Sequence, residues 1–285
     1  MQLNDLTSQN QLDALIALAL REDIFTGDVA TQTIVPISDQ ATALITAKAD
    51  GTVSGIDVAH RVLCHLGENR FEALVKDGDK VVAGQHLIRV TAGYGLLLTA
   101  ERTLLNFMQR MSGIATATAR LVDALKGTSA QLLDTRKTLP GHRYTDKMAV
   151  RHGGGRNHRM GLYDMAMLKD NHIKISGGIK HAVENARQQL PISVLIEVET
   201  SSLDQVREAI AAGADVIMLD NMTNEMMAEA VNIIAHRAKT EASGNITLER
   251  IASVAATGVD YISVGAITHT VKALDISMNF VENQS

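Results

Sequence analysis

The chain has 285 residues, 46% of them hydrophobic, and a formal net charge of −5. This length suffices for one large domain or for two of ordinary size, each with its own apolar core. The acidic balance and an aromatic content of only 3% argue against a dedicated nucleic-acid-binding protein, which usually carries a basic surface or stacking aromatics.

The cysteine count and the opening residues indicate the compartment. Cys64 is the only cysteine, which excludes an intramolecular disulfide and a thiolate metal cluster. The opening residues, MQLNDLTSQNQ, lack the basic and then apolar pattern of a signal peptide. No run of the sequence approaches the roughly 18 apolar residues that span a bilayer. We therefore expect a cytoplasmic protein that does not bind membranes.

The first part of the chain predicts an amphipathic helix followed by a small sheet-rich unit. Apolar side chains recur at helical spacing over residues 11–22 (QLDALIALALRE). Over residues 41–90 the pattern changes to short β-like runs such as ATALITAK and HLIRV, separated by Asp-Gly pairs. A helical stretch over residues 97–125 then leads into the second half.

The second half predicts parallel β/α units, because short apolar runs recur there and most are followed by a helical pattern. The expected strands are QLLDT (131–135), MAMLKD (165–170), VLIEVE (194–199), DVIMLD (215–220), KTEAS (239–243) and YISVG (261–265). Residues 213–220 and 258–265 resemble each other, which indicates a repeated plan. The region is shorter than the roughly 250 residues of an eight-fold barrel, so we expect an incomplete ring.

Polar residues or glycines follow each of these expected strands. The carboxyl ends of barrel strands are where catalytic groups lie in enzymes of this architecture. A single polar residue in such a place more often only ends the strand, but six strand ends together favour a functional site. The residues are Arg136, Lys137, Lys169, Glu199, Asp220, Ser243, Gly244 and Gly265.

Residues 136–159 hold seven Lys or Arg and a single acid, Asp146, although acids outnumber bases in the whole chain. The three glycines at 153–155 would let backbone N–H groups approach an anion, beside guanidinium groups suited to carboxylate or phosphate. The alternative is a flexible, solvated loop. We favour an anion-binding site within residues 134–172 that includes His158 and Arg159.

Glu199 and Asp220 end neighbouring expected strands, so their carboxylates would share one mouth and suit a hydrated Mg²⁺. Glu197 lies on the same face two residues earlier, and only Glu199 is expected to reach the rim. Barrels often bind a phosphate after their last strands, where Gly244 and Gly265 lie with neighbouring residues. His269, a little further on, suits this site and the bare surface equally well.

Several ordered motifs resemble the quinolinate phosphoribosyltransferase family. They are DTRKTLPG (134–141), GGGRNHR (153–159), LKDNH (168–172), EVE (197–199), MLDNM (218–222), ASG (242–244) and GVDYISVG (258–265). REDIFTGD (21–28) and ERTLLN (101–106) fit the first half of that family. The resemblance therefore spans nearly the whole chain.

The resemblance implies an α/β protein with an amino-terminal α/β sandwich domain, residues 1–110 joined by the tail 272–285, and an open β/α barrel catalytic domain, residues 111–271. It also implies a homodimer in which one subunit's sandwich covers its partner's barrel mouth. The implied activity is that of a glycosyltransferase of the pentosyltransferase class. It joins quinolinate to phosphoribosyl pyrophosphate, releases pyrophosphate and CO₂, and gives nicotinate mononucleotide for de novo NAD biosynthesis.

The same resemblance implies roles for the site residues, position by position. The quinolinate carboxylates would be surrounded by Arg136, Lys137, His158, Arg159 and Lys169, with Arg102 of the partner subunit. Glu199 and Asp220 would serve Mg²⁺ and the ribose, while the 5′-phosphate would be bound by Ser243, Gly244, Gly265 and His269. The catalytic residues among these would be Lys137, Lys169, Glu199 and Asp220.

Two positions depart from the family pattern and leave the affinity for substrate open. His142 stands where an apolar residue commonly follows Pro-Gly, and Arg156 stands where a small residue is common.

Three rival hypotheses remain. A barrel aldolase would use Lys169 as a Schiff-base amine, and a related protein found with molybdenum-transport genes tends to lack the KDNH sequence that is intact at 169–172. A non-catalytic protein would bind quinolinate without releasing CO₂.

Overall fold

The computed structural model describes residues 6–35 and 39–281, and the chain forms two compact units. The first unit comprises Met1–Ala119, Thr138–Gly154 and Thr268–Ser285, and the second comprises Arg120–Lys137 and Gly155–Ile267. Residues 1–5 of the polar amino terminus and residues 282–285 of the tail lie outside the described part.

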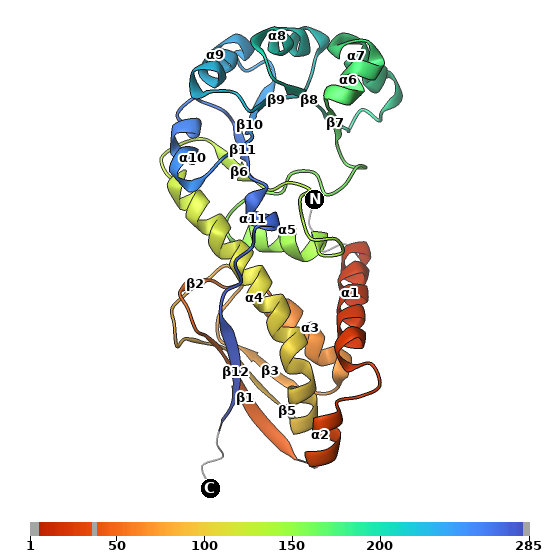
Figure 1. Ribbon diagram of the computed structural model, residues 1–285, viewed down its shortest axis with the longest axis vertical. Helices are drawn as coiled ribbons and strands as arrows, with labels where there is room; N and C mark the ends of the chain where they lie inside the picture. Colours follow the sequence, from red (N-terminus) through yellow and green to blue (C-terminus); the bar gives the residue numbers. More distant parts are fainter. Residues whose placement is uncertain (1–5, 36–38, 282–285) are drawn as a thin grey trace. The chain divides into compact units, whose positions relative to one another are not determined.

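A four-stranded antiparallel sheet in the order β12-β1-β5-β3 forms one layer of the first unit (Figure 1). Its strands are β1 (Gln40–Ala47), β3 (Arg70–Ala73), β5 (His86–Gly93) and β12 (Ile276–Phe280). Alternation along β1 buries Ala43, Ile45 and Ala47 on one face, as expected of a strand with one face in a core. β12 comes from the carboxyl-terminal tail and pairs with β1, so the tail belongs to this unit.

Helices together with this sheet make up the α/β sandwich of the first unit. They are α1 (Leu6–Ile24), α2 (Val29–Ile34), α3 (Ile56–Leu66), α4 (Tyr94–Ala124) and α5 (Arg143–His152), with α11 (Ala266–His269) at the border of the unit. The short strands β2 (Gly51–Thr52) and β4 (Lys80–Val81) pair separately. Among the helices within the described residues, none has the length and apolar content that a membrane span requires.

The expected domain bounds of 1–110 and 111–271 differ from these two units. One helix, α4, runs through residue 110, and the segment that contains α5 belongs to the first unit. α4 continues without a break to Ala124. Arg110 of α4 donates to both carboxylate oxygens of Asp146 in α5, at 2.9 and 2.7 Å. This pair, with Asp146 fully buried, fixes α5 to the first unit, although the sequence placed that segment in the barrel domain.

Six parallel strands in the order β6-β11-β10-β9-β8-β7 form the sheet of the second unit. They are β6 (Gln131–Leu133), β7 (Ala166–Leu168), β8 (Ile196–Thr200), β9 (Val216–Asp220), β10 (Lys239–Ser243) and β11 (Tyr261–Ser263). Every strand expected in this half is present, and the expected and observed bounds of β10 are the same. β6 and β7 are the two edges, so the unit is an open β/α barrel.

Helices cover the outer face of this curved sheet (Figure 1). They are α6 (Asp170–Ser176), α7 (Ile179–Gln189), α8 (Leu203–Ala212), α9 (Asn224–Ile234) and α10 (Leu248–Ala255). Side-chain caps start two of them, because Ser202 accepts from the backbone of Gln205 and Thr223 accepts from that of Met226. Between strands and helices, Val198 is fully buried.

The register of the strands places the expected site residues on one face of the sheet. β8 pairs with β9 as Glu199↔Met218, and β9 pairs with β10 as Asp220↔Ser243. Paired residues share a face, and alternate residues along a strand return to that face. Glu199, Asp220 and Ser243 therefore lie together on the inner face, at the carboxyl ends of three neighbouring strands.

Candidate active site

Side chains from neighbouring strand ends form the rim of the barrel's inner face. Lys169 directly follows β7, and Glu199, Asp220 and Ser243 lie at the ends of β8, β9 and β10. The Lys169 ammonium lies 3.5 Å from the Glu199 carboxylate, and both side chains are partly exposed. The structure thus brings these expected residues to one polar edge that solvent can reach.

Gly244 is required at this rim for a backbone reason. Its φ is +96°, in the left-handed region, and a Cβ at this position would lie only 2.2 Å from Oδ1 of Asn221. Asn221 donates its side-chain N–H to Asp220 at 2.8 Å. The loop after β10 therefore packs closely on the loop after β9, next to the carboxylate of Asp220.

Two arginines of the basic segment come near each other in the second unit. Arg136 is exposed just after β6, and the Arg159 guanidinium donates to the Met165 carbonyl at 3.0 Å. Partial burial and, after it, the positive charge of Arg136 lower the pKa of Arg159. A shared anion stabilises two such guanidinium groups, whose fork geometry suits carboxylates. Lys137, the neighbour of Arg136, is also exposed.

A buried cluster of one histidine and two glutamates lies deeper in the same barrel. Nε2 of His158 is 3.1 Å from Oε2 of Glu197 in β8 and 3.2 Å from Oε2 of Glu241 in β10. The three side chains are 6%, 0% and 2% exposed, in that order. Ionisable groups removed from water in this way cost free energy unless they neutralise one another.

The hydrogen bonds of this cluster locate its ring proton. The Arg159 backbone N–H donates to Nδ1 of His158 at 2.7 Å, so Nδ1 is an acceptor and the proton lies on Nε2, which faces both carboxylates. Burial disfavours charge on the ring, and Glu197 and Glu241 oppose it and raise the pKa of His158. Because the Arg159 N–H occupies Nδ1, the ring carries one proton and no charge. Burial raises the pKa of Glu197 to about 7, against the opposing effect of His158. The ring is thus a neutral donor between two carboxyl groups, and Glu197 keeps its proton up to about neutral pH.

Reasoning from the sequence gave Glu197 no role and did not single out Glu241. The available signal was a glutamate inside each of two otherwise apolar strands, IEVET and KTEAS. A charge in such a place has to be paired. The sequence could not identify the partner of these glutamates. Glu197 and Glu241 contact His158 only through the folding of the barrel, and the pattern of a single strand does not show which residues lie opposite it.

The excess of positive charge over residues 136–159 does not form one cluster. Arg143, Lys147 and Arg151 lie on α5 in the first unit, where a spacing of four puts them on one helical face. The Lys147 side chain is fully buried there. Part of the charge that predicts an anion site therefore belongs to the internal structure of the first unit.

The run of three glycines also has a packing role. A Cβ on Gly153 would lie 2.5 Å from the carbonyl oxygen of Ala115 and 2.6 Å from Cβ of Thr118, so only glycine lets this end of α5 approach α4. Gly154 has a φ of +86°, which favours glycine for backbone reasons. The structure accounts for these two glycines without an anion.

The remaining expected residues divide between the two units. Gly265 follows β11 in the second unit. Arg102 is an exposed residue of α4 and belongs to the first unit, as does His269. His269 is exposed, and its Nδ1 shares a hydrogen bond of 2.8 Å with the hydroxyl of Thr270.

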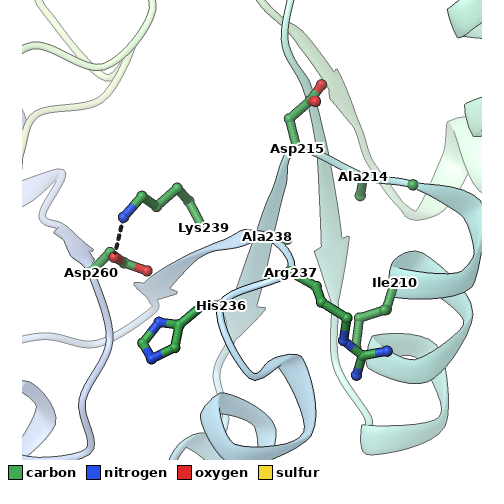
Figure 2. A pocket seen from close by; sticks show the side chains of 9 residues that line it. Ile210, Ala214, Asp215, His236, Arg237, Ala238, Lys239 and Asp260 are labelled. Atoms are coloured by element: carbon green, nitrogen blue, oxygen red, sulfur yellow. Dashed lines mark hydrogen bonds and ion pairs between the residues drawn. The ribbon is translucent and has the colours of Figure 1, made fainter.

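A pocket of about 360 Å³ lies at the amino ends of β9, β10 and β11, at the other end of these strands from the rim (Figure 2). Its charged side chains are paired with one another or with neighbours. Lys239 lies 2.6 Å from Asp260, and Asp215 lies 2.8 Å from Arg187. Residues at this end of a β/α barrel usually contribute to its stability and not to catalysis.

Ser54, His152 and Asp77 gather in the first unit but do not form a catalytic triad. The Ser54 hydroxyl is 2.8 Å from Nδ1 of His152, and the Asp77 carboxylate is 3.9 Å from the same nitrogen. A triad needs the two partners on different ring nitrogens. Ser54 is fully buried as well, so this group is structural.

Comparison with known proteins gives a consistent result. The chain matches the family models of the quinolinate phosphoribosyl transferase C-terminal domain, over residues 114–279, and N-terminal domain, over residues 28–112. A chloroplastic, carboxylating nicotinate-nucleotide pyrophosphorylase of Arabidopsis thaliana is 45% identical over 287 residues, which cover 94% of this chain and 82% of the relative. A probable carboxylating nicotinate-nucleotide pyrophosphorylase of Bacillus subtilis is 45% identical, with coverage of 94% and 93%. The solved structure of NadC from Streptococcus pyogenes is 41% identical, has a TM-score of 0.92, and covers 98% of this chain and 100% of its own.

The buried cluster predicts a pH dependence of stability. Folding raises the pKa of the Glu197 carboxyl from 4.5 to about 7, so this group stabilises the folded state fully below 4.5 and loses that contribution as the pH rises through about 7. We expect the free energy of unfolding in urea to fall between about pH 5 and pH 7 on account of this group, and to fall less in Glu197→Gln. Glu229→Gln, at an exposed position of α9, should follow the wild type. Equal slopes for wild type and Glu197→Gln would contradict the raised pKa.

Proposed function

Because the chain belongs to the quinolinate phosphoribosyltransferase family, we propose that the inner rim of its barrel joins quinolinate to phosphoribosyl pyrophosphate and removes one carboxylate as CO₂. The products would be nicotinate mononucleotide and pyrophosphate, in a step of NAD biosynthesis. The observation that carries this assignment is one rim that combines cationic side chains with two carboxylates. Quinolinate and phosphoribosyl pyrophosphate are both polyanions, so a site for the pair needs positive charge and a place for a cation.

The quinolinate carboxylates suit the cationic part of the rim. An anion between Arg136 and Arg159 would offset the repulsion between their positive charges. Lys137 and Lys169 are exposed at the ends of β6 and β7. His158 is expected in the same group through the family resemblance. Both of its ring nitrogens face groups of the protein, so its proposed contribution is made through the segment that carries it.

Glu199 and Asp220 fit a hydrated Mg²⁺ by the chemistry of their donors. Both offer partly exposed carboxylate oxygens at the ends of adjacent strands. Within the described residues, the three side chains close enough together to hold a metal ion by themselves are those of the buried cluster instead. Mg²⁺ often keeps several waters and takes substrate phosphate oxygens as ligands. When bound, it would neutralise the charge that develops on the departing pyrophosphate.

The chemistry asks the chain mainly to hold two anions in position. The quinolinate ring nitrogen attacks C1 of the ribose, and the bond from C1 to pyrophosphate breaks with its electrons going to pyrophosphate. The ring nitrogen is then cationic and stabilises the electron pair that stays on the neighbouring ring carbon when the carboxylate leaves as CO₂, and that carbon then takes up a proton. Arg136 and Arg159 would fix the ring in line with the ribose, the kind of positioning that supplies much of a rate enhancement.

The phosphate end of the substrate suits the loops after the last strands. Ser243 and Gly244 follow β10, and Gly265 follows β11. The left-handed φ of Gly244 turns the backbone sharply beside the rim, and glycine adds no side chain of its own there. We assign these residues to the 5′-phosphate. His269, which belongs to the first unit, is added to them on the family resemblance alone.

An aldolase mechanism does not suit Lys169. A Schiff-base lysine is an uncharged amine, favoured by an apolar pocket or by neighbouring cations. Lys169 is instead about half exposed, and a carboxylate oxygen of Glu199 lies 3.5 Å from its nitrogen. These surroundings lack the apolar or cationic character that a Schiff-base lysine needs, and an exposed lysine suits an anion-binding role.

We also propose a homodimer that shares its active sites, and a cytoplasmic location. Apolar side chains lie exposed on the first unit at Phe25, Val29 and Ile34, which are 83%, 74% and 78% exposed. Such a group beside α2 suits contact with a second copy. The exposed Arg102 suits a role in the partner's barrel.

Removing the Arg136 guanidinium should disable the enzyme without unfolding it. Arg136→Ala is expected to lower kcat/KM roughly 100-fold or more, because hydrogen bonds to charged groups contribute about 1.5–3 kcal/mol each. The measurement is release of CO₂ from carboxyl-labelled quinolinate in the presence of phosphoribosyl pyrophosphate and Mg²⁺. Arg207→Ala, on the exposed side of α8, is the matched control. Full activity of Arg136→Ala would refute the assignment of the site.

Magnesium dependence tests the carboxylates of the rim. A chelator should abolish pyrophosphate release, and added Mg²⁺ should restore it. Glu199→Gln and Asp220→Asn should each raise the concentration of Mg²⁺ needed for half-maximal rate by about tenfold, since each loses one anionic ligand. Asp204→Asn, at a side chain that is 95% exposed, should leave that concentration unchanged. Full activity without divalent cations would exclude this role.

Mixing two inactive variants tests the shared site. If Arg102 of the partner subunit completes each site, a heterodimer of Arg102→Ala and Arg136→Ala has one site with both arginines and one with neither. Random exchange of subunits should then restore about one quarter of the wild-type rate, because half of the dimers are mixed and half of their sites are intact. Each variant alone should remain inactive. A mixture no more active than its components would argue against sharing.

A further inference from the structure

Residues 156–159, here called the closing segment, run along the open side of the barrel. The Arg156 backbone N–H donates to the Leu132 carbonyl of β6 at 2.8 Å, and the Arg156 carbonyl accepts from the Asp134 N–H at 3.1 Å. The segment thus extends the sheet beyond its edge strand β6. At its other end, Arg159 donates to the carbonyl of Met165, the residue before β7, at 3.0 Å. The segment therefore links the two edge strands that do not pair with each other.

The closing segment is fastened to the barrel by buried acids. The fully buried Asp134 accepts from the side chain of Asn157 at 2.7 Å and from the backbone N–H of His158 at 2.8 Å. The ring of His158 then enters the barrel, where Nε2 lies 3.1 Å from Glu197 and 3.2 Å from Glu241. These acids stand on β8 and β10, so the segment is anchored well beyond the strands that it borders.

The ring of His158 also fixes its neighbour Arg159. The Arg159 backbone N–H donates to Nδ1 at 2.7 Å, so a turn of the ring would break this bond and shift the start of the arginine side chain. The same hydrogen bond also argues against a metal ion bound to Nε2 in this cluster. A metal on Nε2 needs a proton on Nδ1, and metal-bound histidines give that proton to an acceptor. Nδ1 here faces a donor, which favours a proton on Nε2.

We propose that Glu197 and Glu241 are positioning residues that hold His158 and, through it, direct the Arg159 guanidinium toward a substrate carboxylate. Neither glutamate is at the rim, and both are buried to within 2% of full burial. Their effect on the reaction passes through the closing segment. This inference rests on the proposed function for the identity of the substrate, while the geometry of the cluster stands apart from it.

The proposal predicts a selective effect on one substrate. Glu241→Leu removes one acceptor beside Nε2, and a misplaced arginine then weakens quinolinate binding. We expect the KM for quinolinate to rise about tenfold or more, while the KM for phosphoribosyl pyrophosphate changes less than about twofold, because a shift of an ångström can cost a large factor. Glu241→Gln keeps a carbonyl acceptor of similar size and should stay within about threefold of wild type. Glu249→Leu, exposed on α10, is the control.

A double-mutant cycle separates positioning from a general loss of structure. If Glu241 acts through Arg159, then in an Arg159→Ala background Glu241→Leu should cause no further rise in the KM for quinolinate. Additive effects of the two substitutions would overturn the proposal. Equal changes in the KM values of both substrates would overturn it as well, since a merely loosened barrel has no reason to discriminate between them.

Nitrogen-15 NMR of the histidine rings tests the geometry without any assay of activity. Wild type and Glu241→Gln should show His158 with a protonated Nε2 and an unprotonated Nδ1. The reverse tautomer, or a stoichiometric metal on Nε2, would overturn the proposal even if the enzyme is active. If the protein releases no CO₂ from quinolinate but shows the expected tautomer, the proposed function fails and the anchoring remains. If Glu241→Leu does not fold, Glu197→Gln and Glu241→Gln with this measurement still decide the question.

Discussion

The interior of the barrel depends on the contact between the ring of His158 and the carboxylates of Glu197 and Glu241. Removing one partner of a buried polar contact typically costs about 1–3 kcal/mol or more, because the other partner is left unpaired and out of water. Each of the three residues is therefore tied to the other two. Since they stand on β8, on β10 and on the closing segment, this one contact couples parts of the barrel that share no backbone hydrogen bonds.

The strand register turns this buried layer into the support of a site. Glu197 and Glu199 are two residues apart on β8, as Glu241 and Ser243 are on β10, so each strand carries one buried acid beneath one rim residue. The lower layer is closed to solvent and the upper one is open to it. Substitutions in the loops can change the polar residues around the rim. The buried layer below it is fixed by the contacts of Glu197 and Glu241 with His158.

The sequence was a good guide to the elements and an incomplete guide to the site. Alternation and apolar runs predicted all six strands of the barrel, and polar residues at their ends predicted the rim, since both are local properties. The excess of basic residues was misleading in part, because Lys147 is buried in the first unit and Gly153 is required by the packing of α5 on α4. Glu241 could not be interpreted, because its partner lies far away in the sequence at His158.

An open barrel has to satisfy two free edges, and here side chains do much of that work. A seventh or eighth strand would close the ring with backbone hydrogen bonds, which are insensitive to side-chain identity. The closing segment instead uses one stretch of backbone pairing at β6, one guanidinium at β7 and one imidazole in the interior. The last residue of the closing segment is Arg159, and the direction of its side chain depends on its backbone hydrogen bond to the buried His158. The same residues that complete the fold thereby reach the mouth where an anion would bind, so in this barrel the stability of the open side and the geometry of the site cannot vary independently.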